Sequence, residues 1–215
     1  MTKLEKLIKN RIQETGPISI ATYMRECLLH PELGFYTQKN VLGSRGDFIT
    51  SPEISQMFGE ILGLCLAQYW IDLNRPARFA LVEFGPGNGT LMLDILRAGS
   101  SVKGFIEAVE VFLVEASSKL KSEQQKKLSK FNLNWINDDL VIPQIPTLFI
   151  ANEFFDALPV KQYQRENDLW YEVQVGIKND RLSLGLSHEH TTHPELETRF
   201  KDCVTGAVSY THLTL

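Results

Sequence analysis

The sequence has 215 residues, of which 43% are hydrophobic and 10% aromatic, as expected for a soluble globular protein with an apolar core. Its 22 lysine and arginine residues are outnumbered by 26 aspartate and glutamate residues, and the net charge of −4 argues against a general nucleic-acid binder. The three cysteines lack C-x-x-C spacing and predict neither a zinc site nor a disulfide framework. With no targeting peptide and no apolar run of the roughly 18 residues that a membrane span needs, we expect a cytoplasmic protein.

The first part of the chain predicts helices. Residues 3–14 carry apolar side chains at helical spacing, and Ser19 caps a second helix that extends to His30. The run Ser51-Pro52-Glu53 starts a third helix that extends to about Leu73, because serine caps a helix, proline suits its first position and an acid complements its dipole. We expect the third helix to place its large apolar side chains in the core, namely Ile54, Met57, Phe58, Ile61, Leu62, Cys65, Tyr69 and Trp70.

The middle of the chain alternates between strands and helices. Strands are expected at 78–84, 108–115, 133–136 and 147–152, and helices at 91–98 and 117–127. This order predicts an α/β fold with a Rossmann-like parallel sheet and helices on both faces, where ligands bind beyond the carboxyl ends of the strands. After the fourth strand, segments at 160–164, 169–177 and 181–186 predict an antiparallel β meander.

These elements suggest three regions. Residues 1–75 would form a helical segment that covers a cofactor site, and residues 76–187 a Rossmann-like domain with the meander. Residues 188–215 show no period, and we expect an irregular tail that is either disordered or foreign to the natural protein.

A glycine turn between the first strand and its helix is the most informative motif. Gly85, Gly87 and Gly89 follow Glu83 in the order E-F-G-P-G-N-G. The spacing does not fit the dinucleotide fingerprint G-x-G-x-x-G, and the lysine of a P-loop is missing. A turn without a phosphate-binding lysine, preceded by an acid, suits S-adenosylmethionine (SAM), which carries an ammonium and a sulfonium. The alternative is a turn that only connects a strand to a helix.

Acids follow the next two strands. Glu115 ends the second strand, where a carboxylate can accept both ribose hydroxyls of a nucleoside, or else only stabilise a helix start. Asp138 follows the third strand and is our candidate, ahead of Asp139, for the adenine amino group. An ordinary Asx turn explains the position of Asp138 equally well.

The fourth strand ends in an acidic and aromatic loop. Asn152, Glu153 and Asp156 surround Phe154 and Phe155. Carboxylates beside aromatic rings suit a guanidinium or another amine, because the acids match its donors and the rings cover its flat face. We take Glu153 first and Asp156 second as the group that accepts the proton when the methyl group is transferred. Alternatively, Asp156 caps a helix and the phenylalanines belong to the core.

With these motifs, the chain resembles the MidA-type methyltransferases. The resemblance covers about residues 23–186 and is carried by HPELGFY at 30–36, GDFITSPEISQMFGE at 46–60, EFGPGNGTL at 83–91, LVEAS at 113–117 and ANEFFDALPV at 151–160. It implies a SAM-dependent enzyme whose mitochondrial members act in the matrix. Those members methylate an arginine on a core subunit of respiratory NADH dehydrogenase (complex I) during assembly, so the implied partner is a protein.

The resemblance also implies site residues. The three glycines would line the SAM pocket, and Glu115 would bind the ribose. The segment 46–53 would fold over the cofactor and add Asp47, Thr50 and Ser51 to the pocket. Members of the family continue beyond this length, so we expect a C-terminally truncated chain that binds the cofactor weakly or is inactive.

Two other functions are compatible with the motifs. The loop at 152–155 loosely resembles the [DN]-P-P-[YF] loop of amine methyltransferases that act on nucleic acids, although both prolines are missing. A non-catalytic assembly factor could instead keep the fold and dock through the helix expected at 51–73. The sequence indicates neither the oligomeric state nor, without the family, the methyl acceptor.

Overall fold

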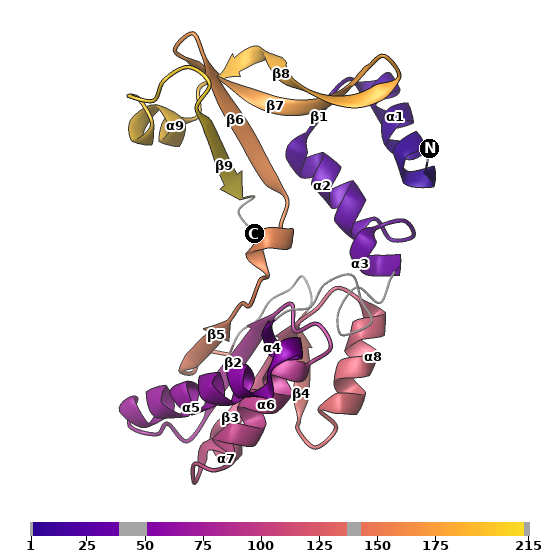
Figure 1. Ribbon diagram of the computed structural model, residues 1–215. Coiled ribbons are helices and arrows are strands. Elements are labelled where there is room, and N and C mark those ends of the chain that lie inside the picture. Colours follow the sequence, from indigo (N-terminus) through magenta and orange to yellow (C-terminus); the bar gives the residue numbers. More distant parts are fainter. Residues whose placement is uncertain (1, 39–50, 137–142, 213–215) are drawn as a thin grey trace. The chain divides into compact units, whose positions relative to one another are not determined.

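Figure 1 shows the computed structural model of the protein, which describes residues 2–38, 51–136 and 143–212. Contacts divide the chain into two compact units, which we name the parallel unit, Lys39–Asp156, and the antiparallel unit, Met1–Gln38 with Ala157–Leu215. These units differ from the regions expected from the sequence, whose boundaries lay after residues 75 and 187. The first two helices and the meander share one unit because they share a core.

The parallel unit is built on a four-stranded sheet with the order β4-β3-β2-β5, in which every neighbouring pair is parallel. This sheet confirms the predicted Rossmann-like arrangement (Figure 1). Its strands are β2 (Phe79–Phe84), β3 (Val109–Val114), β4 (Leu133–Ile136) and β5 (Thr147–Ile150). Its helices are α4 (Ser51–Ile54), α5 (Gln56–Asp72), α6 (Thr90–Gly99), α7 (Phe105–Ala108) and α8 (Ser118–Lys127).

The main core lies on one face of this sheet. Phe79 and Leu81 of β2 pack there with Trp70 of α5, Ile95 of α6 and Phe105 of α7. A smaller buried cluster on the other face, Ala80, Val82 and Ile136, has Phe84, Phe112, Val114 and Ile145 packed against it. In the described part of the chain, this second cluster takes no residue from a helix of the unit, so the expectation of helices on both faces is wrong for these residues.

Helix α5 packs against α6 through glycine. A Cβ atom on Gly63 would lie 2.7 Å from the carbonyl oxygen of Ile95, and one on Gly59 would lie 2.5 Å from Cβ of Asp94. Both glycines are buried, together with Leu66, Ala67 and Trp70. The backbones of the two helices therefore approach more closely than any larger residue at these positions would allow.

Most of the large apolar side chains that were predicted to lie in the core on this helix are exposed, so that prediction is largely wrong. Ile54 is 71% exposed, Met57 63%, Ile61 54% and Tyr69 60%, whereas Trp70 is buried and Leu62 packs against the core. Because the small residues fill the narrow contact with α6, the large ones are left on the outside. The predicted helix is also interrupted at Ser55, whose extended backbone separates α4 from α5.

The antiparallel unit contains a five-stranded sheet with the order β1-β7-β6-β9, in which β8 also pairs with β7. The strands are β1 (Ile18–Ser19), β6 (Val160–Glu166), β7 (Leu169–Lys178), β8 (Arg181–Thr191) and β9 (Val208–His212). The helices are α1 (Lys3–Thr15), α2 (Ile20–Leu29), α3 (Phe35–Gln38) and α9 (Pro194–Arg199). The predicted meander is confirmed, with β8 five residues longer than expected because it pairs with β7 as far as Thr191.

Helix α1 joins this unit through its apolar face. Ile8 and Ile12 are buried against Ile18 of β1 and Val175 of β7. Lys9 lies beside them and forms ion pairs with Glu5 at 3.1 Å and Asp180 at 3.4 Å. This shared core explains why the N-terminal helices group with the meander.

The described residues of the segment expected to be an irregular tail form regular elements and long-range contacts. Leu196 of α9 is buried with Tyr163 and Trp170, and β9 pairs with β6. The buried Arg165 guanidinium donates hydrogen bonds to the carbonyl oxygens of Phe200 and Lys201 at 2.9 and 2.6 Å. These partners lie more than thirty residues from Arg165 along the chain, so a search for local periodicity does not find them.

None of the helices in the described part of the chain is long and apolar enough to cross a membrane.

Replacing Gly63 by alanine should destabilise the parallel unit. The new methyl group must displace the backbone of Ile95, and we expect the free energy of unfolding to fall by about 1–3 kcal/mol. Urea denaturation followed by tryptophan fluorescence measures the change. The matched control is Gly185→Ala, because a Cβ atom there meets nothing within 4 Å. Equal stability of the two variants would contradict the close packing of α5 on α6.

Candidate cofactor site

The register of the parallel sheet brings the predicted site residues to one edge. Phe84, the last residue of β2, pairs with Val114, the last residue of β3. The backbone N–H of Gly85 then donates to the carbonyl oxygen of Val114 at 3.0 Å, so the glycine turn leaves β2 beside Glu115. On the other side of β2, Glu83 pairs with Ile150 at the end of β5. The turn and the acidic loop after β5 therefore share the edge where ligands of such sheets bind.

The glycine turn requires its glycines. Gly85, Gly87 and Gly89 have φ values of 63°, 53° and 75°, a left-handed conformation that side chains disfavour. A Cβ atom on Gly85 would lie 2.8 Å from the ring of Phe154. Gly89 caps α6 without a side-chain hydrogen bond, so the first amides of that helix have no side-chain partner at the cap. The turn therefore has no side chains of its own at these three positions, which suits the close approach of a nucleoside.

Glu115 is held in place from two sides. Its Oε1 accepts from the backbone N–H of Ser117 at 2.8 Å, and its Oε2 accepts from Gln124 at 3.3 Å. Burial raises the pKa of this carboxyl, while these hydrogen bonds oppose the rise. A carboxylate has about four acceptor positions, so Glu115 keeps the capacity to accept from a ribose hydroxyl.

Glu83 is a buried acid. Its side chain is 2% exposed, and its Oε2 has no hydrogen-bond partner among the described residues. Burial raises the pKa of this carboxyl to about 8, so it is protonated at neutral pH. This buried acid is separated from Gly85 by one residue, and the ammonium of a bound cofactor would favour its ionised form.

Glu53 reaches the turn from α4. Its Oε1 accepts from the hydroxyl of Thr90 at 2.7 Å and from the amide of Asn88 at 3.4 Å. Lys127 of α8 donates to the same threonine hydroxyl at 2.6 Å. Sequence reasoning treated Glu53 only as an acid at a helix start, because its partners lie more than thirty residues away. Ser51, which the family resemblance had placed in the pocket, is exposed at the first residue of α4.

The acidic loop follows the end of β5. Glu153 and Asp156 are exposed, Asn152 is half-buried, and Glu153 has a φ of 53°, which is unusual for a residue other than glycine. Phe154 lies on the glycine turn, with its ring centroid 5.6 Å from Phe84. Asp156 lies inside a short 3-10 helix, η1 (Phe155–Ala157), and does not cap a longer helix. Asp47, Thr50 and Asp138 lie outside the described residues.

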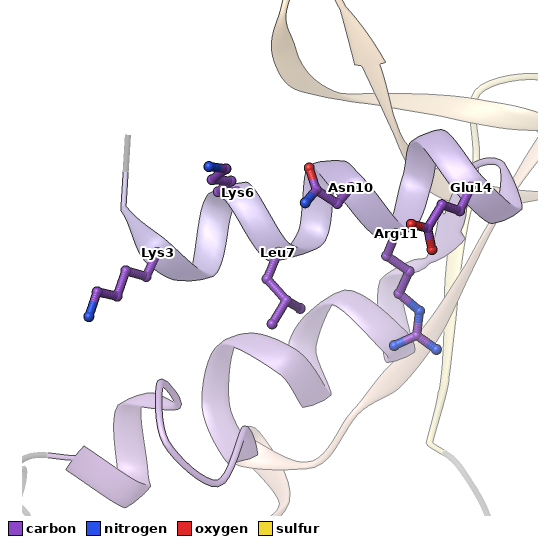
Figure 2. A pocket seen from close by; sticks show the side chains of 6 residues that line it. All are labelled: Lys3, Lys6, Leu7, Asn10, Arg11 and Glu14. Carbon is purple, nitrogen blue, oxygen red and sulfur yellow. The ribbon is translucent and has the colours of Figure 1, made fainter.

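A shallow hollow lies along α1 in the antiparallel unit (Figure 2). Its lining mixes charges of both signs with an amide and one leucine: Lys3, Lys6, Leu7, Asn10, Arg11 and Glu14. Arg11 forms an ion pair with Glu26 of α2 at 2.6 Å. The hollow belongs to the unit without the glycine turn. The described residues contain no cluster of three or more histidine, cysteine, aspartate or glutamate side chains that could hold a metal ion.

Comparisons with known proteins agree with this geometry. Residues 61–214 match the family described as "Putative S-adenosyl-L-methionine-dependent methyltransferase". A structure of a protein regarded as a methyl transferase from Burkholderia thailandensis, bound to S-adenosyl-homocysteine, superposes with a TM-score of 0.80 at 25% identity. That comparison covers 97% of this chain and 56% of the other.

Similar curated proteins carry a more specific name. The chain is 38% identical over 212 residues to a protein of Danio rerio named protein arginine methyltransferase NDUFAF7, mitochondrial, and 37% identical over 218 residues to its Homo sapiens counterpart. These alignments cover 86% and 89% of this chain but 50% and 49% of the relatives. The chain thus spans about half the length of the relatives it matches.

The chain belongs to this family of SAM-dependent methyltransferases, and the MidA-type resemblance is confirmed. SAM is therefore the cofactor of its family, and the glycine turn, the orphaned acid Glu83 and the held carboxylate Glu115 fit that cofactor.

The raised pKa of Glu83 should make stability depend on pH. The folded chain keeps this proton up to about pH 8, whereas the unfolded chain loses it near pH 4.5. The contribution of protonated Glu83 is therefore complete below pH 4.5 and is lost as the pH rises to about 8. Across that window we expect the free energy of unfolding to fall by up to ~1.4 kcal/mol per pH unit.

Glu83→Gln should remove this slope, because an amide does not ionise. Denaturation at a series of pH values measures the slope, and Glu107→Gln, at an exposed site of the same unit, is the matched control. A slope that persists in Glu83→Gln and matches that of Glu107→Gln would show that another group is responsible.

Proposed function

We propose that this chain forms the cofactor-binding part of a SAM-dependent protein methyltransferase whose acceptor is an arginine side chain. The observation that supports this most directly is the meeting of the glycine turn with Glu115 at the carboxyl edge of β2 and β3. The acceptor class is supported by the names of the relatives, which are protein arginine methyltransferases. Those names give no support to a nucleic-acid amine as acceptor.

The cofactor contacts follow from the turn and its neighbours. The backbone of Gly85, Gly87 and Gly89 would face the methionine part and the ribose of the cofactor. Glu83 would lie beneath the turn at the end of β2, and Glu115 would accept hydrogen bonds from the ribose hydroxyls. The bound cofactor supplies an activated methyl group, so the protein has mainly to align the acceptor and exclude water. We also propose that Asp138 binds the adenine. The residues that would cover the cofactor are Asp47, Thr50 and Ser51.

The acidic loop supplies the candidate residues for the acceptor. Glu153 and Asp156 are exposed at the edge of the sheet that carries the glycine turn, and Phe154 lies directly on that turn. A guanidinium that enters here can donate to the carboxylates while an aromatic ring covers its face. Glu153 would accept the proton that the attacking nitrogen loses, and Asn152 and Asp156 would orient the acceptor.

We extend the proposal to the biological setting by analogy with the relatives. The acceptor protein would be a subunit of the respiratory NADH dehydrogenase or, in a bacterium, an equivalent protein in the cytoplasm. The relatives from animals are named as mitochondrial proteins.

Replacing Glu115 by alanine should weaken cofactor binding. Loss of hydrogen bonds from ribose to a charged acceptor costs roughly 1.5–3 kcal/mol, so the Kd for S-adenosylhomocysteine should rise about 10- to 100-fold. Isothermal titration calorimetry measures this Kd, with circular dichroism to verify the fold. The exposed Glu107→Ala serves as the matched control, and an unchanged Kd for Glu115→Ala would remove Glu115 from the site.

Replacing Glu153 by glutamine should slow methyl transfer and leave cofactor affinity unchanged. Loss of a general base typically reduces a rate by about 10²- to 10⁴-fold. Mass spectrometry of proteins from cells with and without the gene identifies the lost methyl mark, and the same peptide then reports the rate of each variant. Glu195→Gln, an exposed change in α9, is the control. A wild-type rate for Glu153→Gln would show that Glu153 does not accept the proton. Full rescue of a deletion strain by Glu153→Ala without methylation would favour a non-catalytic assembly factor.

A further inference from the structure

Gln124 of α8 is a completely buried polar residue that links both halves of the candidate site. Its side chain is 0% exposed. Its Nε2 donates to the carbonyl oxygen of Gly87 at 2.8 Å and to Oε2 of Glu115 at 3.3 Å, and its Oε1 accepts from the indole N–H of Trp135 at 2.9 Å. One amide thus contacts the glycine turn after β2, the carboxylate after β3 and a side chain of β4.

The indole fixes the orientation of this amide. The Nε1–H of Trp135 can only donate, so the atom of Gln124 that faces it has to be the oxygen. The amino group then faces Gly87 and Glu115, and each of its two hydrogens has an acceptor. A reversed amide would place an oxygen against two acceptors and an amino group against a donor, which costs several unmade hydrogen bonds in a buried position.

The two groups that Gln124 holds have different origins. The glycine turn leaves β2, whereas Glu115 follows β3, and the ladder between the strands ends at the pair Phe84 and Val114. Beyond that pair, the distance between turn and carboxylate depends on the contact of Gly85 with Val114 and on the bridge through Gln124. A nucleoside that touches the turn and also donates its ribose hydroxyls to Glu115 needs this distance to be constant.

We propose that Gln124 is a positioning residue for the cofactor, which sets the carboxylate of Glu115 at a constant distance from the glycine turn and leaves its remaining acceptor positions to the ribose. This inference rests on the cofactor site proposed above. Trp135 supports the same arrangement, because its indole N–H selects the orientation of the amide.

Gln124→Glu tests the bridge with almost no change in volume. One carboxylate oxygen can still accept from Trp135, but at pH 8 the other oxygen faces Gly87 and Glu115 without a hydrogen to donate. We expect the Kd for S-adenosylhomocysteine, relative to wild type at the same pH, to rise at least about tenfold at pH 8. At pH 5.5 the introduced carboxyl, once protonated, can donate one hydrogen bond, so the ratio should become smaller.

The neighbouring Gln125 gives a matched control, because Gln125→Glu makes the same chemical change on the exposed side of the same helix. Its Kd ratio should stay near one at both pH values. Gln124→Met fills the space without a donor and should also weaken binding, and a cooperative thermal transition verifies that this variant folds. This second variant decides the outcome if Gln124→Glu fails to fold.

Each result has a distinct meaning. Wild-type affinity of Gln124→Met, or a Kd ratio near one for Gln124→Glu at pH 8, would overturn the positioning role and leave the cofactor site intact. The role would also be overturned if Gln124→Glu folds and loses affinity equally at both pH values while Gln124→Met binds like the wild type. If the unsubstituted chain binds no S-adenosylhomocysteine, the proposed cofactor site fails, and the role of Gln124 fails with it.

Discussion

The register between β2 and β3 is the constraint on which the candidate site depends. Because Phe84 stands beside Val114, both strands end at the same level, and the glycine turn and Glu115 leave the sheet together. A slip of one residue would turn Glu83 from the main core face to the other face of the sheet. The apolar side chains of β2 pack on both faces of the sheet, so the strand that carries the glycine turn is also part of the hydrophobic core.

Three segments distant in sequence then converge on the glycine turn. Glu53 binds Thr90 at its end, Gln124 binds Gly87 in its middle, and the ring of Phe154 lies on Gly85 at its start. The carboxylate of Glu53 and the amide of Gln124 would be costly to bury alone, and each finds a hydrogen-bond partner on the turn or next to it. The turn is thereby held without being covered by side chains of its own, which suits a surface that has to accept a ligand.

The sequence was most informative where local pattern decides the structure. The alternation of strands and helices predicted the parallel sheet, and the spacing of Gly85, Gly87 and Gly89 predicted the turn. Glu53 and Gln124 were missed because an acid or an amide on a helix has no local sign of a partner more than thirty residues away. The prediction that the large apolar side chains of α5 lie in the core was wrong for a related reason. Apolar periodicity does not reveal that a neighbouring helix leaves room only for glycine.

Helix α5 consequently shows two very different tolerances to mutation. At Gly59 and Gly63, every amino-acid replacement adds at least a Cβ atom where Asp94 or Ile95 already lies, so selection should keep both glycines. On the opposite surface, exposed side chains such as Met57 and Ile61 bury little area, and charged replacements there would cost the folding reaction little. That surface is accordingly the first place to engineer when crystals or concentrated samples of this chain are needed.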